Sequence, residues 1–316
     1  METVSEVYVG VDISKDSLDI YIHPIGKSFK IANTKSEIQK LIKKLTKYQV
    51  KNIVCEATGG YEKLLADILK KSLYALWIVD PRRIKGFIIA SGCRSKTDKI
   101  DAQKIAEFAA KNNRDYISIC KTKNQEILLA FVNRKNDLVK FLGSEKTRLK
   151  HPSHALYLAS IKKIIKTLEC EIKSIDKQIQ SLIAQDDELN SKSQLLESIP
   201  GIGKASAATL LATVPELGKL SNAKVSALIG VCPYDNASGK YKGKKFIKGG
   251  RITPRNMLYM CALTTIKYNL VLKKIYDRLR ANNRPFKVAI VTVMHKLVIF
   301  ANSILKKGEK YKVQNY

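Results

Sequence analysis

The sequence predicts an α/β domain followed by a mostly helical one. Three observations support this fold class. Apolar β-rich runs alternate with helical spacings in the first part, a heptad pattern follows, and the last part is helical and rich in small residues. We therefore expect a mixed sheet with flanking helices, then a coiled-coil segment, then a helical domain. The corresponding ranges are 1–150, 151–192 and 193–316.

The first part begins with a strand hairpin. Val7–Ile13 and Ser17–His23 are close enough in sequence to pair, and Phe29–Asn33 adds a third strand. Helices and strands then alternate, which predicts a mixed sheet covered by helices. The expected elements are a helix over Ser36–Tyr48, a strand over Asn52–Glu56, a helix over Tyr61–Lys71, a strand over Ala75–Val79 that stops at Asp80-Pro81, and a helix over Asp98–Asn112 with Thr97 as its N-cap.

A heptad pattern marks the middle of the chain. Apolar residues alternate spacings of three and four for more than three heptads, with charged residues between them, which is typical of a coiled coil that associates with a second subunit. The alternative is an amphipathic helix that packs on its own domain. The seam consists of Leu158, Ile161, Ile165, Leu168, Ile172, Ile175, Ile179 and Leu182.

The charge balance predicts a polyanionic partner. Lys and Arg total 57 against 28 Asp and Glu, a formal net charge of +29 spread along the 316 residues. Phosphate contacts dominate nucleic-acid affinity, so DNA or RNA is the expected partner. The alternative is a solvated, lysine-rich surface.

Other features predict a reduced, cytoplasmic protein. The six cysteines are scattered and form no CxxC pair, which favours buried thiols over disulfides or a zinc site. The N-terminal METVSEVYVG does not resemble a signal peptide. The apolar run Val288–Phe300 is short and contains His295 and Lys296, so we expect a buried helix there.

Four acidic residues stand in settings that suit a metal site. Asp12 lies in VYVGVDISKD and Glu56 in NIVCEATGGY, each at the end of an apolar run, and Asp98 and Asp101 share one helical turn of KTDKIDA. In so basic a protein, carboxylates oppose phosphate binding unless a divalent cation lies between them. Mg²⁺ or Mn²⁺ bound by carboxylate oxygens would serve phosphodiester chemistry. The alternative is a set of ordinary surface acids.

Several motifs together resemble the DEDD transposases of insertion sequences, relatives of the Piv-type DNA invertases. These motifs are DISK at 12–15, CEATGGY at 55–61, VDPRRIKGF at 79–87 and KTDKIDA at 96–102. The resemblance implies an RNase H-like, RuvC-like first domain whose four metal ligands match Asp12, Glu56, Asp98 and Asp101. It also implies nucleic-acid contacts from Lys15, Arg82, Arg83 and Lys96.

The second half carries two further motifs. SIPGIGKASAATLLA at 198–212 has the pattern of a helix-hairpin-helix, with Lys204 opening the second helix beside a glycine turn. A plain turn between two core helices is the alternative. The segment 228–263 resembles the C-terminal domain of the same transposases, and this resemblance implies that Ser238 is the nucleophile. Without this resemblance, residues 236–239 would be interpreted as a turn. Basic residues follow that suit phosphate contacts, namely Lys240, Lys242, Lys244, Lys245, Lys248, Arg251 and Arg255.

The resemblance implies a cytoplasmic recombinase that cuts and joins DNA through Ser238 with metal assistance. It further implies a noncoding bridge RNA that pairs with donor and target DNA, and dimers that pair into a tetramer on DNA. Three alternatives stay open: a RuvC-like nuclease that uses water, a protein-only DNA invertase, and a nucleic-acid-binding protein without catalysis.

Overall fold

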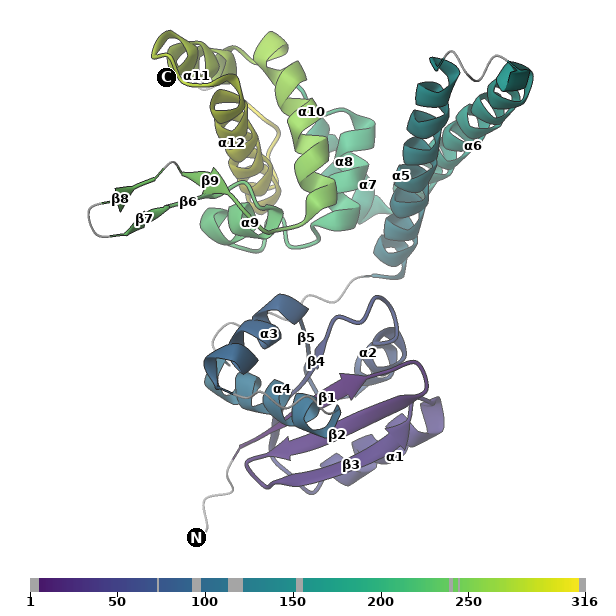
Figure 1. Ribbon diagram of the computed structural model, residues 1–316, viewed down its shortest axis with the longest axis vertical. Helices are drawn as coiled ribbons and strands as arrows, with labels where there is room; N and C mark the ends of the chain where they lie inside the picture. Colours follow the sequence, from purple (N-terminus) through teal and green to yellow (C-terminus); the bar gives the residue numbers. More distant parts are fainter. Residues whose placement is uncertain are drawn as a thin grey trace. The chain divides into compact units, whose positions relative to one another are not determined.

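The computed structural model describes residues 6–72, 74–92, 98–112, 122–151, 156–238, 241–243 and 245–312, with the side chains of 98–100, 237–238 and 241–242 left out. The chain divides into two compact units, Met1–Cys120 and Lys121–Tyr316 (Figure 1). This division lies earlier than the boundary expected at 150. The physical reason is that the helix after residue 122 packs into the second unit.

The first unit contains a five-stranded mixed sheet, as the sequence predicted. The strand order is β3-β2-β1-β4-β5. The β1–β2 and β2–β3 pairs are antiparallel, and the β1–β4 and β4–β5 pairs are parallel. The strands are β1 (Val7–Ile13), β2 (Ser17–His23), β3 (Lys27–Ala32), β4 (Val50–Glu56) and β5 (Leu76–Val79). This topology is compatible with an RNase H-like domain.

Helices cover both faces of this sheet. On one face, α1 and α2 bury their apolar residues against the odd-numbered residues of β1. On the other face, α3 and α4 pack against Val54, Trp77 and Val79. Figure 1 shows α4 lying across the sheet. The helices are α1 (Lys35–Leu45), α2 (Lys63–Leu69), α3 (Pro81–Ala90) and α4 (Asp98–Asn112).

Helix α3 was not expected from the sequence, where Asp80-Pro81 was interpreted only as the end of a strand. The Asp80 carboxylate accepts a hydrogen bond from the Arg82 backbone N–H, and Pro81 occupies the first turn. An N-cap acid followed by proline is a start signal for a helix, because proline has no N–H to leave unpaired there.

The second unit begins with two long helices that pack along each other (Figure 1). Ile175, Ile179 and Ile183 share one apolar core with residues of α5 such as Leu128 and Val132. The heptad seam therefore packs within the chain, as the intramolecular alternative predicted. Association of subunits through this segment stays a prediction. The two helices are α5 (Lys123–Leu149) and α6 (Leu158–Gln185).

Six further helices build the rest of the described core of this unit. Helix α12 is long and apolar enough to cross a membrane by length and composition, but half of its most apolar window is buried inside the unit. It packs as a core helix, as expected from the sequence, with Ile290, Val293 and Leu297 fully buried. The helices are α7 (Asp187–Glu197), α8 (Lys204–Thr213), α9 (Asn222–Ile229), α10 (Ile252–Tyr268), α11 (Leu270–Ala281) and α12 (Phe286–Lys307).

A two-stranded arm lies between α9 and α10. Strand β6 pairs antiparallel with β9, and farther out β7 pairs with β8. Figure 1 shows the arm extending away from α9 and α12 of the same unit. The strands are β6 (Pro233–Tyr234), β7 (Ala237–Ser238), β8 (Tyr241–Lys242) and β9 (Phe246–Ile247).

Candidate active site

Asp12 and Glu56 lie at the same edge of the sheet. The parallel pairing of β1 with β4 places Val11 beside Cys55, so the next residue of each strand is one of the two acids. Both acids are half-buried. Because side chains alternate along a strand, Asp12 shares a face with Gly10, and Glu56 shares a face with Val54. Val54 packs with α4, so both acids belong to the face that α4 covers.

Gly10 permits the close approach of α4. A Cβ atom there would lie 2.1 Å from the Ala102 carbonyl oxygen and 2.6 Å from the Ala106 nitrogen, closer than real Cβ contacts allow. Ala102, Ala106 and Asp98 follow one another at spacings of four, so all three lie on the row of α4 that faces β1.

The direction of α4 brings its first turn toward the two strand-end acids. Glu107, farther along the helix, lies close enough to His23 for an electrostatic interaction that helps to lower the Glu107 pKa. His23 pairs with Tyr8, near the start of β1. The start of α4 therefore points toward the end of β1. Four helical residues from Ala102 back to Asp98 span about 6 Å, and two strand residues from Gly10 to Asp12 span about 6.6 Å. These similar steps place the backbone of Asp98 over the position of Asp12.

The four acids are thus brought together at the level of the backbone. Asp101 is half-buried on the first turn of α4, whereas the Asp98 side chain lies outside the described residues. Among the side chains that the structure describes, no three His, Cys, Asp or Glu groups gather closely enough to hold a metal ion. A closed site would need the Asp98 carboxylate as well. Carboxylates are the oxygen donors that Mg²⁺ and Mn²⁺ prefer, so the donor set fits these cations.

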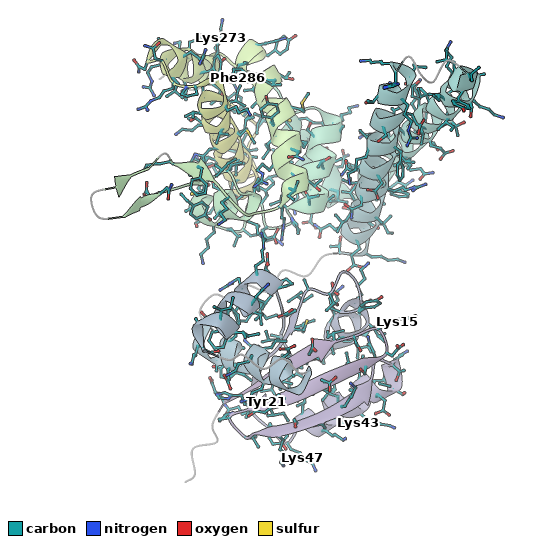
Figure 2. The ribbon with its side chains drawn as sticks, viewed as in Figure 1. Lys15, Tyr21, Lys43, Lys47, Lys273 and Phe286 are labelled. Atoms are coloured by element: carbon teal, nitrogen blue, oxygen red, sulfur yellow. The ribbon has the colours of Figure 1, made fainter. Side chains whose placement is uncertain are left out.

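The turn after Asp12 is held by short hydrogen bonds. The Ser14 hydroxyl bonds to the Ser17 hydroxyl at 2.9 Å and accepts from the Ser17 N–H at 3.0 Å. Lys15 is exposed on this turn, and Figure 2 shows it at the end of the β1–β2 hairpin. The phosphate contact that the sequence resemblance implies for Lys15 stays a prediction.

The loop after Glu56 is organised by Glu62. One oxygen of the Glu62 carboxylate accepts hydrogen bonds from the Thr58 hydroxyl at 2.6 Å, the Thr58 N–H at 3.2 Å and the Gly60 N–H at 2.9 Å. Burial opposes ionisation of this carboxyl, but these hydrogen bonds prevail and lower its pKa below the ordinary value. The loop that follows a candidate metal ligand is therefore tied to an ionised carboxylate.

Asn33 contacts both of these segments. Its side-chain amide donates to the Ser14 carbonyl at 3.1 Å and to the Tyr61 carbonyl at 3.4 Å, and its backbone N–H donates to the Asp16 carbonyl at 3.0 Å. Sequence reasoning identified neither Asn33 nor Glu62. For Glu62 the available signal was an acid placed four residues after a threonine at the start of a helix. Asn33 gave no comparable signal, because its partners are distant in sequence.

Ser238 ends strand β7 of the arm. It pairs with Tyr241, and residues 239–240, including the predicted phosphate contact Lys240, lie outside the described residues. The Asn236 carbonyl accepts a hydrogen bond from the Gly243 N–H at 2.8 Å, which continues the ladder toward the base of the arm. The serine is thus placed on an extended two-stranded element rather than in a plain turn.

Two of the arginines predicted to bind nucleic acid have partners within the chain. Arg251 forms a two-pronged ion pair with Glu216, with both N–O distances 2.6 Å, and donates to the Thr213 carbonyl at 2.8 Å. Arg255 donates to the Gly249 carbonyl. These bonds anchor the glycine pair at the base of the arm, so both side chains have structural roles.

Arg82 and Arg83 also have partners. Arg82 pairs with the Asp80 carboxylate at 2.5 Å, and its hydrogen bonds are the main reason why the Asp80 pKa lies below its ordinary value. The Arg83 guanidinium lies over the rings of Trp77 and Phe108, 5.8 and 5.3 Å from their centroids. Such contacts explain the positions of these two side chains without nucleic acid.

The remaining predicted basic contacts differ in exposure. Lys204 and Lys248 are exposed and have no ion pair with a residue of the described ranges. Lys245 pairs with Asp235 at 2.6 Å on the exposed arm, a contact worth about 0–1 kcal/mol. The structure describes the backbone but not the side chain of Lys242, and Lys96 and Lys244 lie outside the described residues.

The helix-hairpin-helix pattern corresponds to the α7–α8 junction. Gly201 has a φ of +106°, and a Cβ there would lie 2.0 Å from the Thr265 hydroxyl oxygen of α10. This glycine is therefore needed for packing. Gly203 has no atom within 4 Å of such a Cβ, and it precedes the exposed Lys204 at the start of α8. The packing of Gly201 fits a plain turn between core helices. The open space at Gly203 and the exposed Lys204 fit a phosphate-binding hairpin, so both interpretations remain.

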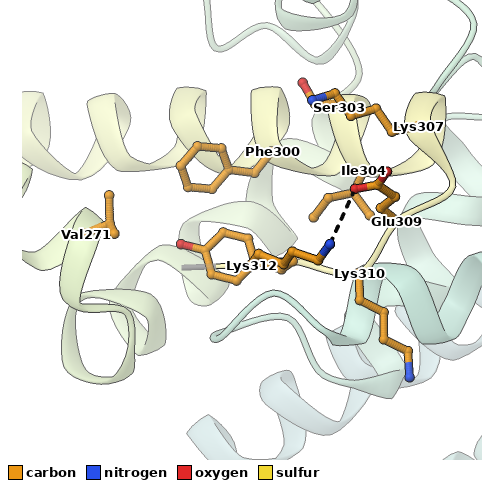
Figure 3. A pocket seen from close by; sticks show the side chains of 9 residues that line it. Val271, Phe300, Ser303, Ile304, Lys307, Glu309, Lys310 and Lys312 are labelled. Carbon is orange, nitrogen blue, oxygen red and sulfur yellow. Dashed lines mark ion pairs between the residues drawn. The ribbon is translucent and has the colours of Figure 1, made fainter. Parts of the chain in front are cut away.

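A small pocket of about 180 Å³ lies where the chain leaves α12 (Figure 3). Phe300 and Tyr311 form an aromatic pair there, with centroids 5.6 Å apart. Lys307 and Lys310 stand at its rim, and Lys312 pairs with Glu309 at 3.8 Å. The pocket is basic, so it suits an anionic group better than a metal ion.

Comparison with known proteins identifies the class of protein to which the chain belongs. A model of DEDD-type transposases matches residues 9–156, and a model described as the IS116/IS110/IS902 transposase family matches residues 193–277. The pilin gene-inverting proteins of Moraxella bovis and Moraxella lacunata are each 26% identical to the chain over 319 residues, covering 98% of both sequences. The fold and these matches define an enzyme that transposes or recombines DNA. The chain belongs to the IS110 family of DEDD transposases.

Proposed function

We propose that this transposase is the site-specific recombinase of an insertion sequence. It cuts and joins DNA strands through Ser238, with divalent-metal assistance at Asp12, Glu56, Asp98 and Asp101. One observation carries the proposal. The ends of β1 and β4, with Asp12 and Glu56, and the first turn of α4, with Asp98 and Asp101, converge at one edge of the sheet. The topology of this sheet is compatible with an RNase H-like fold.

The acids would hold Mg²⁺ or Mn²⁺. When bound, such a cation lowers the pKa of an attacking hydroxyl and stabilises charge on the phosphate. Asp12 and Glu56 supply oxygens from rigid strand ends, and Asp98 and Asp101 supply them from a helix that Gly10 holds against β1. Lys15, on the turn after Asp12, would bind an adjacent phosphate and orient the strand.

Ser238 would carry the covalent step. Its Oγ attacks a DNA phosphorus, a new O–P bond forms, and the bond from that phosphorus to one deoxyribose oxygen breaks. The serine proton leaves to a base, and the released oxygen takes up a proton to become a hydroxyl. In the joining step a DNA hydroxyl attacks the phosphoserine, which restores Ser238 and needs no ATP.

The partners follow from the family and the charge. The net charge of +29 suits DNA and a structured RNA. The bridge RNA implied by the resemblance would determine which DNA sequences are recombined. Homo-oligomers would assemble on donor and target DNA in the cytoplasm. Sequencing the nucleic acid that copurifies with the protein tests this part. A heterogeneous mixture without a discrete RNA would contradict RNA guidance.

DNA inversion without RNA is a second candidate. It is favoured by the full-length similarity to proteins named for inverting a pilin gene. A plasmid assay with an invertible segment, performed with purified protein free of RNA, distinguishes the two candidates. Inversion under these conditions supports the protein-only reaction, and recombination only after the RNA is restored supports guidance.

A suicide substrate tests the serine chemistry. DNA that loses a strand fragment after cleavage should trap the protein in an adduct that survives denaturing electrophoresis, because the link is a phosphodiester. Ser238→Ala should form no adduct and still bind DNA, since phosphate contacts come from Lys and Arg. Cleavage by Ser238→Ala at the wild-type rate, with free ends and no adduct, would indicate a hydrolytic RuvC-like nuclease.

A further inference from the structure

Asn33 occupies the junction between β3 and α1, outside every motif that identified the chain. Through one side chain and one backbone N–H it binds the turn at Ser14 and Asp16 and the loop at Tyr61. The first segment follows Asp12 by two residues, and the second follows Glu56 by five. Asn33 therefore connects the chain beyond one acid to the chain beyond the other.

The orientation of this amide is determined by its partners. Both contacts are carbonyl oxygens, which accept but do not donate, so the amide nitrogen must face them. The Asn33 Oδ1 atom is buried and has no hydrogen-bond partner among the residues that the structure describes. A buried acceptor without a partner costs about 1–3 kcal/mol. The side chain is thus retained for its two donor bonds despite that cost.

The two loops are ordered by their own contacts as well. The β1–β2 turn is closed by the Ser14–Ser17 bonds, and the loop after Glu56 is gathered by the Glu62 carboxylate. Each is a stiff local unit, so a bond between them restricts how one moves relative to the other. Asn33 supplies that bond.

We propose that Asn33 is a positioning residue that sets the separation of Asp12 and Glu56, and hence the affinity of the pair for a divalent cation. This inference rests on the proposed metal site. Groups that orient metal ligands without touching the metal typically change metal affinity by about 10- to 100-fold when removed. We expect the lower part of that range, because the strand pairing of β1 with β4 also holds the two acids.

Asn302 of α12 provides a matched control. Its amide also links separate segments, accepting from the Gly218 N–H at 2.8 Å and donating to the Leu220 carbonyl at 3.1 Å. It belongs to the second unit, whereas the acids belong to the first. Removing it should reduce stability by the loss of comparable hydrogen bonds, and it should not change the affinity of the acids for metal.

The experiment measures Mn²⁺ binding by isothermal titration of the full-length protein, at a temperature where circular dichroism shows each variant folded. Asn33→Asp preserves the side-chain volume and removes both donor bonds, and Asn33→Ala is the second variant. Both should bind Mn²⁺ about tenfold more weakly than wild type. Asn302→Ala should stay within about twofold. Hydrogen exchange of residues 57–62 should be faster in the Asn33 variants without metal, and unchanged in Asn302→Ala.

Asp12→Ala tests the metal site separately from the positioning role of Asn33. If Asp12→Ala loses Mn²⁺ binding while both Asn33 variants bind like wild type, the positioning role is wrong and the metal site stands. If Asp12→Ala also binds like wild type, both the metal site and the positioning role are wrong. Equal weakening by Asn33→Asp and Asn302→Ala would mean a general loss of stability and would likewise overturn the role of Asn33.

Discussion

Gly10→Ala should disrupt the site without touching an acid. The added Cβ would lie 2.1 Å from the Ala102 carbonyl oxygen, 2.6 Å from the Ala106 nitrogen and 2.9 Å from the Ala106 Cβ. Two of these atoms belong to the helix backbone, so no side-chain rotation relieves the contact. Restoring an ordinary van der Waals separation requires α4 to move by about 1 Å or more relative to β1.

The expected effects are large for so small a change. Overpacking of this kind costs about 1–3 kcal/mol of unfolding free energy. A 1 Å misplacement of reacting groups can lower the rate about 100-fold, and α4 carries Asp98 and Asp101. Cleavage should therefore fall more than the folded fraction accounts for. Urea unfolding followed by circular dichroism measures the stability, and a suicide-substrate assay measures the cleavage.

Gly86→Ala in α3 is the matched control within the same unit. Gly86 lies inside a helix, and a Cβ there meets no atom within 4 Å. Alanine should stabilise that helix by about 0.5–1 kcal/mol and leave cleavage unchanged. If Gly10→Ala matched the wild type in both stability and cleavage, the close contact of α4 with β1 would be refuted, and with it the argument that places Asp98 over Asp12.

Two other predictions concern different parts of the chain. Ile179→Asp places a charge in the seam between α6 and α5, where Ile179 is buried, so the unfolding free energy of the second unit should fall by the several kcal/mol that a buried, unpaired charge costs, and its calorimetric midpoint should fall with it. An unchanged midpoint would contradict packing of the seam within the chain. The lowered pKa of Glu62 means that its ionised form stabilises the fold; this contribution is complete above the ordinary pKa of 4.5 and is lost as the pH falls through the lower pKa of the folded state. Glu62→Gln should therefore flatten the acid side of the stability profile measured by urea unfolding, and a profile as steep as that of wild type would show that these hydrogen bonds contribute nothing.

Local patterns predicted the first unit well. The runs at Val7–Ile13 and Ser17–His23 are regular strands with the expected bounds, because alternating burial leaves one register for the hairpin. The failure at α3 came from interpreting Asp80-Pro81 as a stop, although the same pair is a start signal for the helix that follows. Periodicity gives the type of an element more reliably than its ends.

Tertiary partners were harder to infer. The heptads of α6 predicted a packed seam but could not show whether the partner was α5 or another subunit, since the apolar spacing is the same in both cases. Composition assigned Arg251 and Arg255 to phosphate, whereas the structure pairs them with Glu216 and the Gly249 carbonyl. Asp12 and Glu56 were found because they end apolar strands, and Asp98 and Asp101 because they share one helical turn. Asn33 was missed because its role depends on contacts between segments far apart in sequence.

The arm that carries Ser238 has a mechanical consequence. Its base is fixed by Arg251 and Arg255, while Tyr234 and Phe246 beyond it remain 46% and 47% exposed, so little packing supports the strands from the side. At about 3.3 Å per residue, Ser238 stands roughly 16 Å beyond Pro233. The position of Ser238 is therefore sensitive to the angle at which the arm leaves the unit. A tilt of about 10° at the base would move the serine by roughly 2–3 Å over that length. A shift of this size would take the Ser238 hydroxyl out of range of the phosphorus that it attacks.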